Sequence, residues 1–206
     1  SLYKISRSKK FDSLKCNITN YKKLNSKLSK INVNFEYVIN LSGQIEKNKK
    51  KLKENIIKGN TNLLKYFNNT NTKMILLSSA LVYKSSNNFQ NEKTKPEPST
   101  YYGRLKLQAE KLYNKNSKNF LIIRSGNIYD DNLMKSGLLG NIYDSIFKNK
   151  KLFINNVNSN RPYIHILDFC NLLFKIINKR YNKSKITINF CSENYTNQDI
   201  INLYEK

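Results

Sequence analysis

The stretch STYYGRLKLQAE, residues 99–110, opens a predicted helix and places Tyr102 and Lys106 four residues apart. Side chains at this spacing lie on one face of a helix, one turn apart. Upstream, the apolar run at residues 74–77 ends in two serines, of which the second is Ser79. A nearby ammonium favours the phenolate form of a tyrosine and lowers its pKa from about 10. A serine at a strand end, followed by a tyrosine and a lysine on a helix, therefore predicts a proton-transfer site.

Strands and helices alternate around this stretch. Apolar or alternating segments predict strands at residues 2–5, 14–18, 35–41, 74–77, 120–124, 162–166 and 186–190. Periodic segments predict helices at residues 21–28, 49–67, 101–113, 137–147, 168–179 and from 197 onward, with Asp168 capping the helix that it begins. The alternation predicts an α/β fold, a doubly wound Rossmann-like parallel sheet with its first strand missing and a small C-terminal substrate-binding portion.

Composition limits the classes of protein that need to be considered. The chain has 206 residues, of which 39% are hydrophobic, enough for a folded core. No apolar run approaches the ~20 residues of a membrane span, and residues 1–4 do not resemble a secretory signal. The cysteines Cys16, Cys170 and Cys191 are few and widely spaced, which favours reduced, buried thiols in a cytoplasmic protein over disulfides or a metal site.

The net charge of +23 raises the possibility of nucleic-acid binding. Lysine, asparagine and isoleucine are, however, abundant throughout the chain, including positions that share no face. We therefore interpret the lysines as a solvated surface and expect neither a nucleic-acid nor a membrane partner.

Five ordered segments resemble a known family. They are SSALVY (78–83), YGRLK (102–106) with Glu110, VINLSG (38–43), RSGNIY (124–129) and RPYIHILD (161–168). Together they resemble the extended short-chain dehydrogenase/reductase family, and within it the NAD(P)-dependent sugar-nucleotide epimerase/dehydratase group. The chain departs from the family pattern at Asp130, where glycine is usual, and at Pro162, which replaces an acid.

The resemblance implies a catalytic serine at Ser79, an acid/base at Tyr102, and at Lys106 a cation that holds the nicotinamide ribose. It implies that Ser79, Asn127 and Arg161 bind the substrate, since an arginine fork suits the diphosphate of a nucleotide sugar. The residues that it assigns to the cofactor are Arg7, Asn17, Ile18, Leu41, Ser42, Gly43, Tyr102, Lys106 and Gly126. His165, the only histidine, is interpreted as a hydrogen-bonded structural residue.

The choice between NADP and NAD leans slightly toward NADP. In this fold an acid binds the free adenosine ribose hydroxyl, whereas an arginine suits a 2′-phosphate. At the end of the first predicted strand the acid is absent and Arg7 is present. Asn17 stands where the family often has an acid near the adenine.

The glycine-rich phosphate loop of such folds is missing, because none of the six glycines follows an early strand. Loss of the central first strand is expected to leave a slot between the strands at residues 2–5 and 35–41. We expect a fragment that, expressed alone, neither folds stably nor binds cofactor. Residues 1–130 would form a partial NAD(P)-binding domain, and residues 131–206 a partial substrate-binding region whose strand at 186–190 returns to the sheet.

The resemblance implies an NAD(P)-dependent epimerase of a nucleotide-linked sugar. Dehydratases of the group carry an Asp-Glu pair where this chain has Ala80 and Leu81, which disfavours dehydration. An NADPH-dependent sugar-nucleotide reductase and a non-catalytic cofactor-binding member are the alternatives. The resemblance also implies a possible homodimer through the helices at residues 52–67 and 101–113.

Overall fold

The main sheet has four parallel strands in the order β3-β4-β5-β8. A computed structural model describes residues 2–7, 13–43, 46–86, 88–131, 137–154, 156–179 and 184–204. The strands are β3 (Tyr37–Asn40), β4 (Lys73–Leu77), β5 (Phe120–Ser125) and β8 (Lys185–Phe190). Every residue of β5 is buried, as expected of a central parallel strand covered on both faces.

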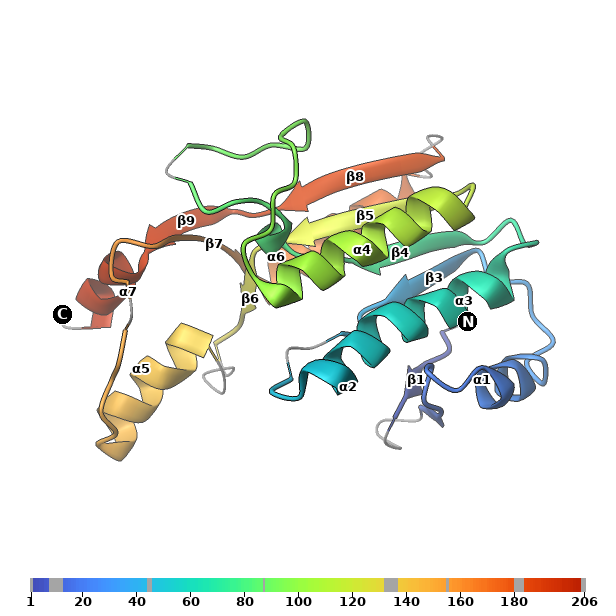
Figure 1. The fold of residues 1–206 in the computed structure, drawn as a ribbon, viewed down its shortest axis with the longest axis horizontal. Coiled ribbons are helices and arrows are strands. Elements are labelled where there is room, and N and C mark those ends of the chain that lie inside the picture. The colour runs from blue at the N-terminus through green and yellow to red at the C-terminus, as the bar shows by residue number, and fades with distance from the viewer. Residues whose placement is uncertain are drawn as a thin grey trace.

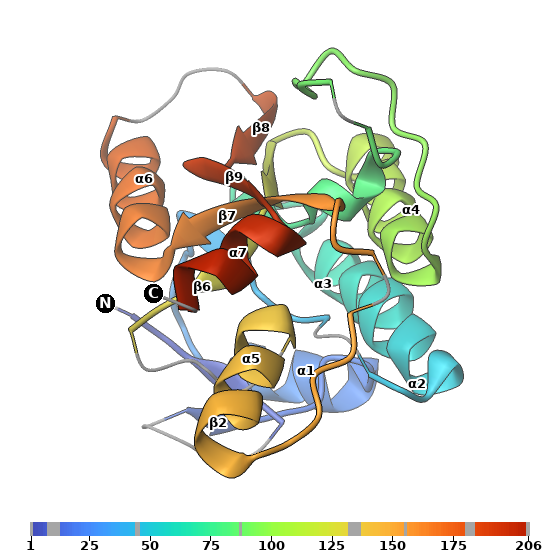
Figure 2. The ribbon, with the colours of Figure 1, turned by 90° about the vertical axis from the view of Figure 1, so that its left-hand side faces the viewer.

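Helices cover both faces of this sheet. Figure 2 shows α6 on one side of the strands and α3 and α4 on the other. The helices are α2 (Lys49–Lys53), α3 (Gly59–Phe67), α4 (Tyr101–Asn116) and α6 (Ile166–Asn178). The predicted α/β parallel fold is therefore confirmed. Between α2 and α3 lies a π-helical turn, η1 (Glu54–Lys58), which the sequence periodicity did not reveal.

Two hydrophobic clusters form the core on the two faces of the sheet. One contains Leu64, Leu76 and Tyr113 and fills the space under α3 and α4. The other contains Ile75, Leu121 and Phe169 and lies under α6. Adjacent residues of β4, Ile75 and Leu76, thus face opposite clusters, which is the alternation of a strand that is buried on both sides.

A smaller lobe follows β5. It contains β6 (Asn127–Tyr129), α5 (Gly137–Lys148), β7 (Asn160–His165), β9 (Glu193–Thr196) and α7 (Asn197–Tyr204). β7 pairs in parallel with β6 and antiparallel with β9. The carboxyl ends of the main strands point toward this lobe (Figure 1). β8 then returns beside β5, pairing Phe120 with Lys185 through to Ser125 with Phe190.

The N-terminal segment forms a separate pair of short parallel strands, β1 (Ile5–Ser6) and β2 (Leu14–Lys15). Helix α1 (Tyr21–Leu28) follows, capped by the side chain of Asn20. In the described part of the chain, no hydrogen-bonded ladder joins β1 to β3. The sheet is thus interrupted between the two strands where the sequence suggested a slot.

Some local expectations were wrong. Asp168 does not cap α6: the helix begins two residues earlier, with His165 at the N-cap, and Asp168 lies in its first turn. Cys16 is buried, but Cys170 and Cys191 are exposed, although all three are free thiols. Among the described residues, no helix is both long and apolar enough to cross a membrane.

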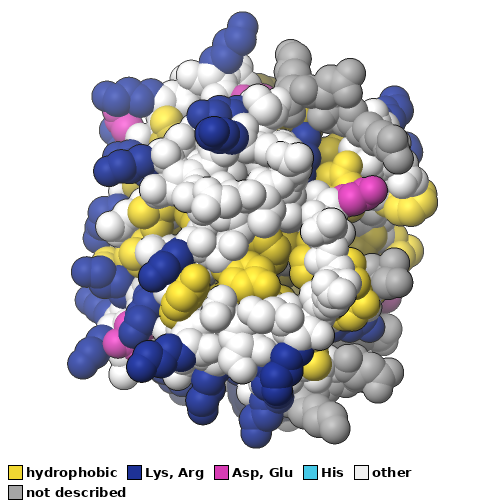
Figure 3. All heavy atoms as spheres, turned by 90° about the vertical axis from the view of Figure 1, so that its right-hand side faces the viewer, with side chains coloured by type: hydrophobic (Ala, Val, Ile, Leu, Met, Phe, Trp, Pro, Cys, Tyr) yellow, Lys and Arg dark blue, Asp and Glu magenta, His cyan; other side chains and the backbone are white. Residues whose placement is uncertain are grey.

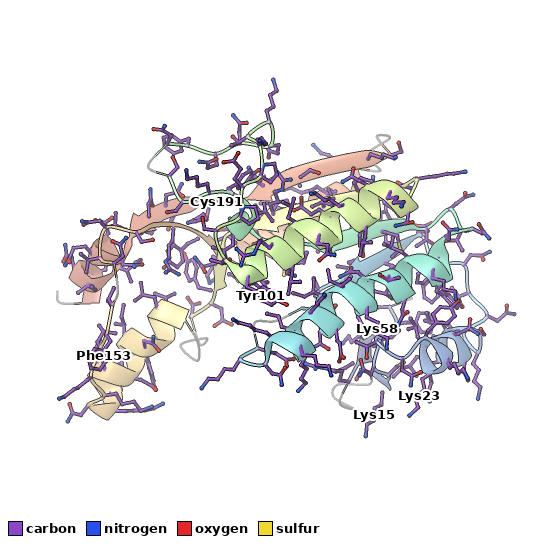
Figure 4. All side chains as sticks on the ribbon, in the orientation of Figure 1. Lys15, Lys23, Lys58, Tyr101, Phe153 and Cys191 are labelled. Atoms are coloured by element: carbon purple, nitrogen blue, oxygen red, sulfur yellow. The ribbon has the colours of Figure 1, made fainter. Side chains whose placement is uncertain are left out.

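The lysines are spread over the surface. On the face shown in Figure 3, Lys and Arg side chains gather mainly along the left and lower margins, and hydrophobic side chains are exposed near the centre. Figure 4 likewise shows the labelled Lys15, Lys23 and Lys58 on the N-terminal part of the fold, away from the small lobe.

Candidate active site

The turn that follows Ser79 contacts the start of helix α4, which carries Tyr102. Ser79 follows β4 and caps a 3₁₀ turn, η2 (Ala80–Val82), by accepting a hydrogen bond from the Leu81 amide. Helix α4 packs against this turn at Gly103, where an added Cβ would lie 2.1 Å from the Leu81 carbonyl oxygen. Only glycine allows this approach. Gly103 therefore determines how closely the start of α4, with Tyr102, approaches the η2 turn.

Tyr102 lies in the first turn of α4. Thr100 caps the helix by accepting a hydrogen bond from the Gly103 amide. The ammonium of Lys106 lies 5.5 Å from the centre of the Tyr102 ring. The expectation that this ammonium lowers the tyrosine pKa is wrong in this arrangement, because burial raises the pKa of Tyr102 to about 12. At neutral pH Tyr102 is a protonated phenol, ready to donate.

Lys106 is directed at the ends of two neighbouring strands. Its Nζ donates to the carbonyl oxygen of Leu77 at 2.9 Å, at the end of β4, and to that of Ser42 at 3.4 Å, just beyond β3. Burial lowers the pKa of Lys106 to about 8, and the charge of Glu110 opposes that effect. The lysine thus ties the segment after β3 to the helix that carries Tyr102.

The segment after β3 has the features of a cofactor cradle. Gly43 has a φ of +101° and so adopts a conformation that favours glycine. A Cβ there would lie 3.1 Å from the Lys106 Nζ, so this backbone passes close to the lysine. The hydroxyl of Ser42 is buried without a hydrogen-bond partner among the described residues, which leaves a polar atom for a ligand. These residues fit a cofactor ribose beside Lys106.

Hydrogen bonds between two asparagines hold the segment after β3 in its orientation. Asn40, the last residue of β3, donates to the side chain of Asn60 in α3 at 2.7 Å and accepts from the Ser42 amide at 3.0 Å. Asn60 in turn donates to the Ile56 carbonyl in the π-helical turn. Neither asparagine was predicted from the sequence. A signal was present, since Asn60 is a polar residue at the centre of a predicted amphipathic helix.

Three residues that were assigned to the cofactor lie in the N-terminal part of the fold, namely Arg7, Asn17 and Ile18. In the described part of the chain, their polar contacts do not include Lys106. Arg7 forms an ion pair with Glu46 at 3.3 Å. Asn17 accepts a hydrogen bond from the Thr19 amide, and the Ile18 carbonyl accepts one from Asn62 in α3. Because a carboxylate already faces Arg7, the lean toward NADP that rested on this arginine finds no support.

Of the residues assigned to the substrate, Asn127 and Arg161 lie on the small lobe, whereas Ser79 follows β4 of the main sheet. Asn127 is exposed in β6 and donates to the Pro162 carbonyl at 3.1 Å, beside Arg161 in β7. Gly126 joins this lobe to the main sheet by donating its amide to the Phe190 carbonyl at 2.9 Å. Asn127 and Arg161 are therefore neighbours, on the lobe that the carboxyl ends of the main strands face (Figure 1).

The expectation that His165 is hydrogen-bonded is wrong at its Nε2, which is buried without a hydrogen-bond partner among the described residues. Its ring contacts Tyr129 edge-on at 5.2 Å, and its Nε2 lies 3.6 Å from the Asp131 carboxylate. Across the residues that the structure describes, no three His, Cys, Asp or Glu side chains gather as a metal site would require.

Comparisons with known proteins identify the family and the fold of the chain. The family model described as "NAD dependent epimerase/dehydratase family" matches residues 3–191. A search of curated proteins finds no significant match.

Many solved structures share the fold. UDP-glucuronic acid 4-epimerase from Bacillus cereus, solved with UDP-glucuronic acid and NAD, superposes with a TM-score of 0.81 and 20% identity, covering 95% of this chain and 65% of that one. WbmG from Bordetella bronchiseptica, solved with NAD and UDP, gives 0.78 and 14%, covering 93% and 61%. L-threonine dehydrogenase from Phytophthora infestans gives 0.70 and 18%, covering 93% and 67%. At these identities the likeness shows the fold alone, and the chain spans 61–67% of the length of these proteins.

Proposed function

Because the chain belongs to the NAD dependent epimerase/dehydratase family, we propose that it is part of an enzyme that epimerises a nucleotide-linked sugar with NAD. The family match covers residues 3–191 and confirms the resemblance identified from the sequence. The observation that carries the proposal is the convergence of Tyr102, Lys106 and the Ser79 turn at the carboxyl end of β4, facing the lobe with Asn127 and Arg161.

Each residue would have a distinct role. Ser42 and Gly43, with Lys106, would hold the ribose of the cofactor, while Asn127 and Arg161 would bind the diphosphate of the substrate. Bound NAD would supply the acceptor, and later the donor, of the hydride. The carbon that bears the reacting hydroxyl would lose its hydrogen as that hydride, and the hydroxyl would lose its proton to Tyr102. The reversed transfer to the other face of the ketone would give the epimer. Ser79 would hold the reacting oxygen throughout.

Tyr102 suits the return step in particular. Since burial raises its pKa to about 12, it holds a proton at neutral pH and can donate it to the developing alkoxide. The oxidation step would start from the phenolate, which is the form that burial of Tyr102 disfavours in this structure. Residues 1–130 would thus hold the cofactor, and residues 131–206 would contribute part of the substrate site.

NAD is proposed over NADP. Arg7, which would have to receive a 2′-phosphate, is paired with Glu46 at 3.3 Å. Of the solved relatives, the Bacillus cereus and Bordetella bronchiseptica proteins were crystallised with NAD.

The test uses the intact protein with NAD and a panel of UDP-sugars, with chromatography of the products. An epimerase converts one sugar nucleotide to its epimer without net consumption of cofactor, whereas a reductase consumes reduced cofactor with each turnover. Tyr102→Phe should lower kcat by roughly 10²–10⁴-fold, the usual contribution of a positioned acid/base.

Tyr101→Phe is the matched control. Tyr101 precedes Tyr102 at the same end of α4 (Figure 4), is similarly half-buried, and faces Lys49 instead of Lys106. Loss of the Tyr101 hydroxyl, which has no part in the proposed reaction, should leave kcat within about twofold of the wild type. Equal effects of the two substitutions, or full activity of Tyr102→Phe, would contradict the proposal. A folded protein that binds NAD but turns over no substrate would favour the non-catalytic alternative.

A further inference from the structure

A buried ion pair lies directly behind the candidate active site. Arg124, near the end of β5, donates from Nη2 to the Glu110 Oε2 of α4 at 2.7 Å and from Nε to Oε1 at 3.1 Å. The two side chains are only 8% and 3% exposed. The remaining Arg124 nitrogen, Nη1, donates to the hydroxyl of Tyr83 at 2.8 Å. Such pairs are weak contributors to stability, so their presence invites another explanation.

The pair is connected to the strand that leads to Ser79. The hydroxyl of Ser78 donates to the Glu110 Oε1 at 2.5 Å. One turn earlier on the same helix, Lys106 donates to the carbonyl of Leu77. Two successive residues at the end of β4 are therefore held by two successive turns of α4, and Ser79 comes next.

The Lys106–Leu77 and Ser78–Glu110 hydrogen bonds differ in whether the residue of α4 has a further role at the site. Lys106 also contacts the Ser42 carbonyl and, in the proposed function, the cofactor ribose. The proposed function places no substrate or cofactor on the Glu110 carboxylate, and Arg124 donates hydrogen bonds to both of its oxygens. The Ser78–Glu110 hydrogen bond can therefore keep its geometry throughout the reaction.

We propose that Ser78, anchored by the Glu110–Arg124 ion pair, is a positioning residue that sets the place of Ser79 relative to Tyr102. The inference rests on the proposed function for its kinetic consequence, but its structural consequence does not depend on it. A hydrogen bond to a charged, immobilised carboxylate is short and directional. It fixes the strand end from which Ser79 projects, and displacements of about 1 Å at a reacting group can cost roughly 100-fold in rate.

The kinetic test compares three substitutions of Ser78 in the intact protein. Ser78→Ala removes the bond and should lower kcat ten- to a hundredfold while KM and the Kd for NAD change less than threefold. Ser78→Thr restores the hydroxyl and should recover most of kcat. Ser78→Cys keeps the volume with a weaker donor and should fall between the two.

Thr72→Val is the matched control, since it removes a buried hydroxyl at the opposite end of β4. Thr72 is 5% exposed and donates to the Phe35 carbonyl at 2.8 Å. This variant should keep kcat within twofold. A Ser78→Ala protein with wild-type kcat, or one whose loss is matched by Thr72→Val, would overturn the inference.

A second measurement needs no substrate. The amides of Leu81 and Val82 are bound by the hydroxyl and the carbonyl of Ser79, so their hydrogen exchange reports where Ser79 lies. Exchange at both should be at least tenfold faster in Ser78→Ala and unchanged in Thr72→Val. Unchanged exchange in Ser78→Ala overturns the inference whatever the protein's activity. Faster exchange in a protein that turns over no nucleotide sugar supports the inference and places the failure with the proposed function.

Discussion

The substitution Gly103→Ala tests how Tyr102 and Ser79 are held together. A Cβ at this position would lie 2.1 Å from the Leu81 carbonyl oxygen, whereas real Cβ contacts below 3.0 Å are essentially never seen. Helix α4 and the η2 turn must therefore separate by about 1 Å, the difference between these distances. Alanine gains up to about 1 kcal/mol over glycine in a helix, while overpacking costs about 1–3 kcal/mol. The free energy of unfolding should therefore fall by only about 0–2 kcal/mol.

The effect on catalysis should be larger. A displacement of this size at a reacting group lowers the rate by roughly 100-fold, or about 2.7 kcal/mol of activation free energy. Urea denaturation gives the first quantity, and kcat for sugar-nucleotide epimerisation gives the second. Gly59→Ala serves for comparison of stability, because its Cβ would meet only the end of the Ile18 side chain, at 2.8 Å, which can turn aside. A folded Gly103→Ala protein with kcat within threefold of the wild type would mean that catalysis does not depend on this close approach.

Three more substitutions or conditions probe other parts of the site. Arg161→Ala should raise KM for the nucleotide sugar by roughly ten- to a hundredfold with little change in kcat, because a hydrogen bond to a charged group contributes about 1.5–3 kcal/mol. An unchanged KM in steady-state kinetics would show that Arg161 does not belong to the site. Because burial lowers the pKa of Lys106 to about 8, its charge is present below that pH and lost above it. The Kd for NAD, measured by fluorescence titration, should therefore rise between pH 7 and 9 in the wild type but not in Lys106→Arg, and a parallel rise in both would contradict the assignment. The isolated polypeptide of residues 1–206 should neither melt cooperatively nor bind NAD, since β1 and β2 are not hydrogen-bonded to β3 in the described part of the chain; calorimetry that detects both would show this expectation to be wrong.

The sequence predicted the elements whose pattern depends on burial. The apolar runs that form β4 and β5 are buried on both faces of the sheet. The cap of α1 is local in sequence, because the Asn20 side chain accepts from the Lys23 amide three residues away. β6 and β9 were not predicted, because they are three and four residues long and partly exposed, so no apolar alternation marks them. The π-helical turn was not predicted, because a single wide turn barely changes the periodicity of a long helix.

The site was predicted by residue type and order, and the limits of that method are visible in Tyr102. Four-residue spacing correctly placed Lys106 beside its ring, at 5.5 Å. The direction of the pKa shift depends on burial, and burial is a property of the folded chain. Glu110 was noted only as part of a resemblance; its pairing with Arg124 depends on how α4 lies over β5, which no local pattern specifies.

The interrupted sheet has a consequence for handling this polypeptide. In the described residues β3 has a hydrogen-bonded neighbour on one side only. Ile39 within the strand and Leu41 just after it are 38% and 60% exposed. Such an edge can template strands from other molecules. With a net charge of +23, copies of the chain repel one another, and salt weakens that repulsion over a Debye length of about 10 Å at 0.1 M. The repulsion between lysine-rich surfaces therefore opposes aggregation through the exposed edge of β3. Precipitation during purification should increase with ionic strength and depend less on temperature.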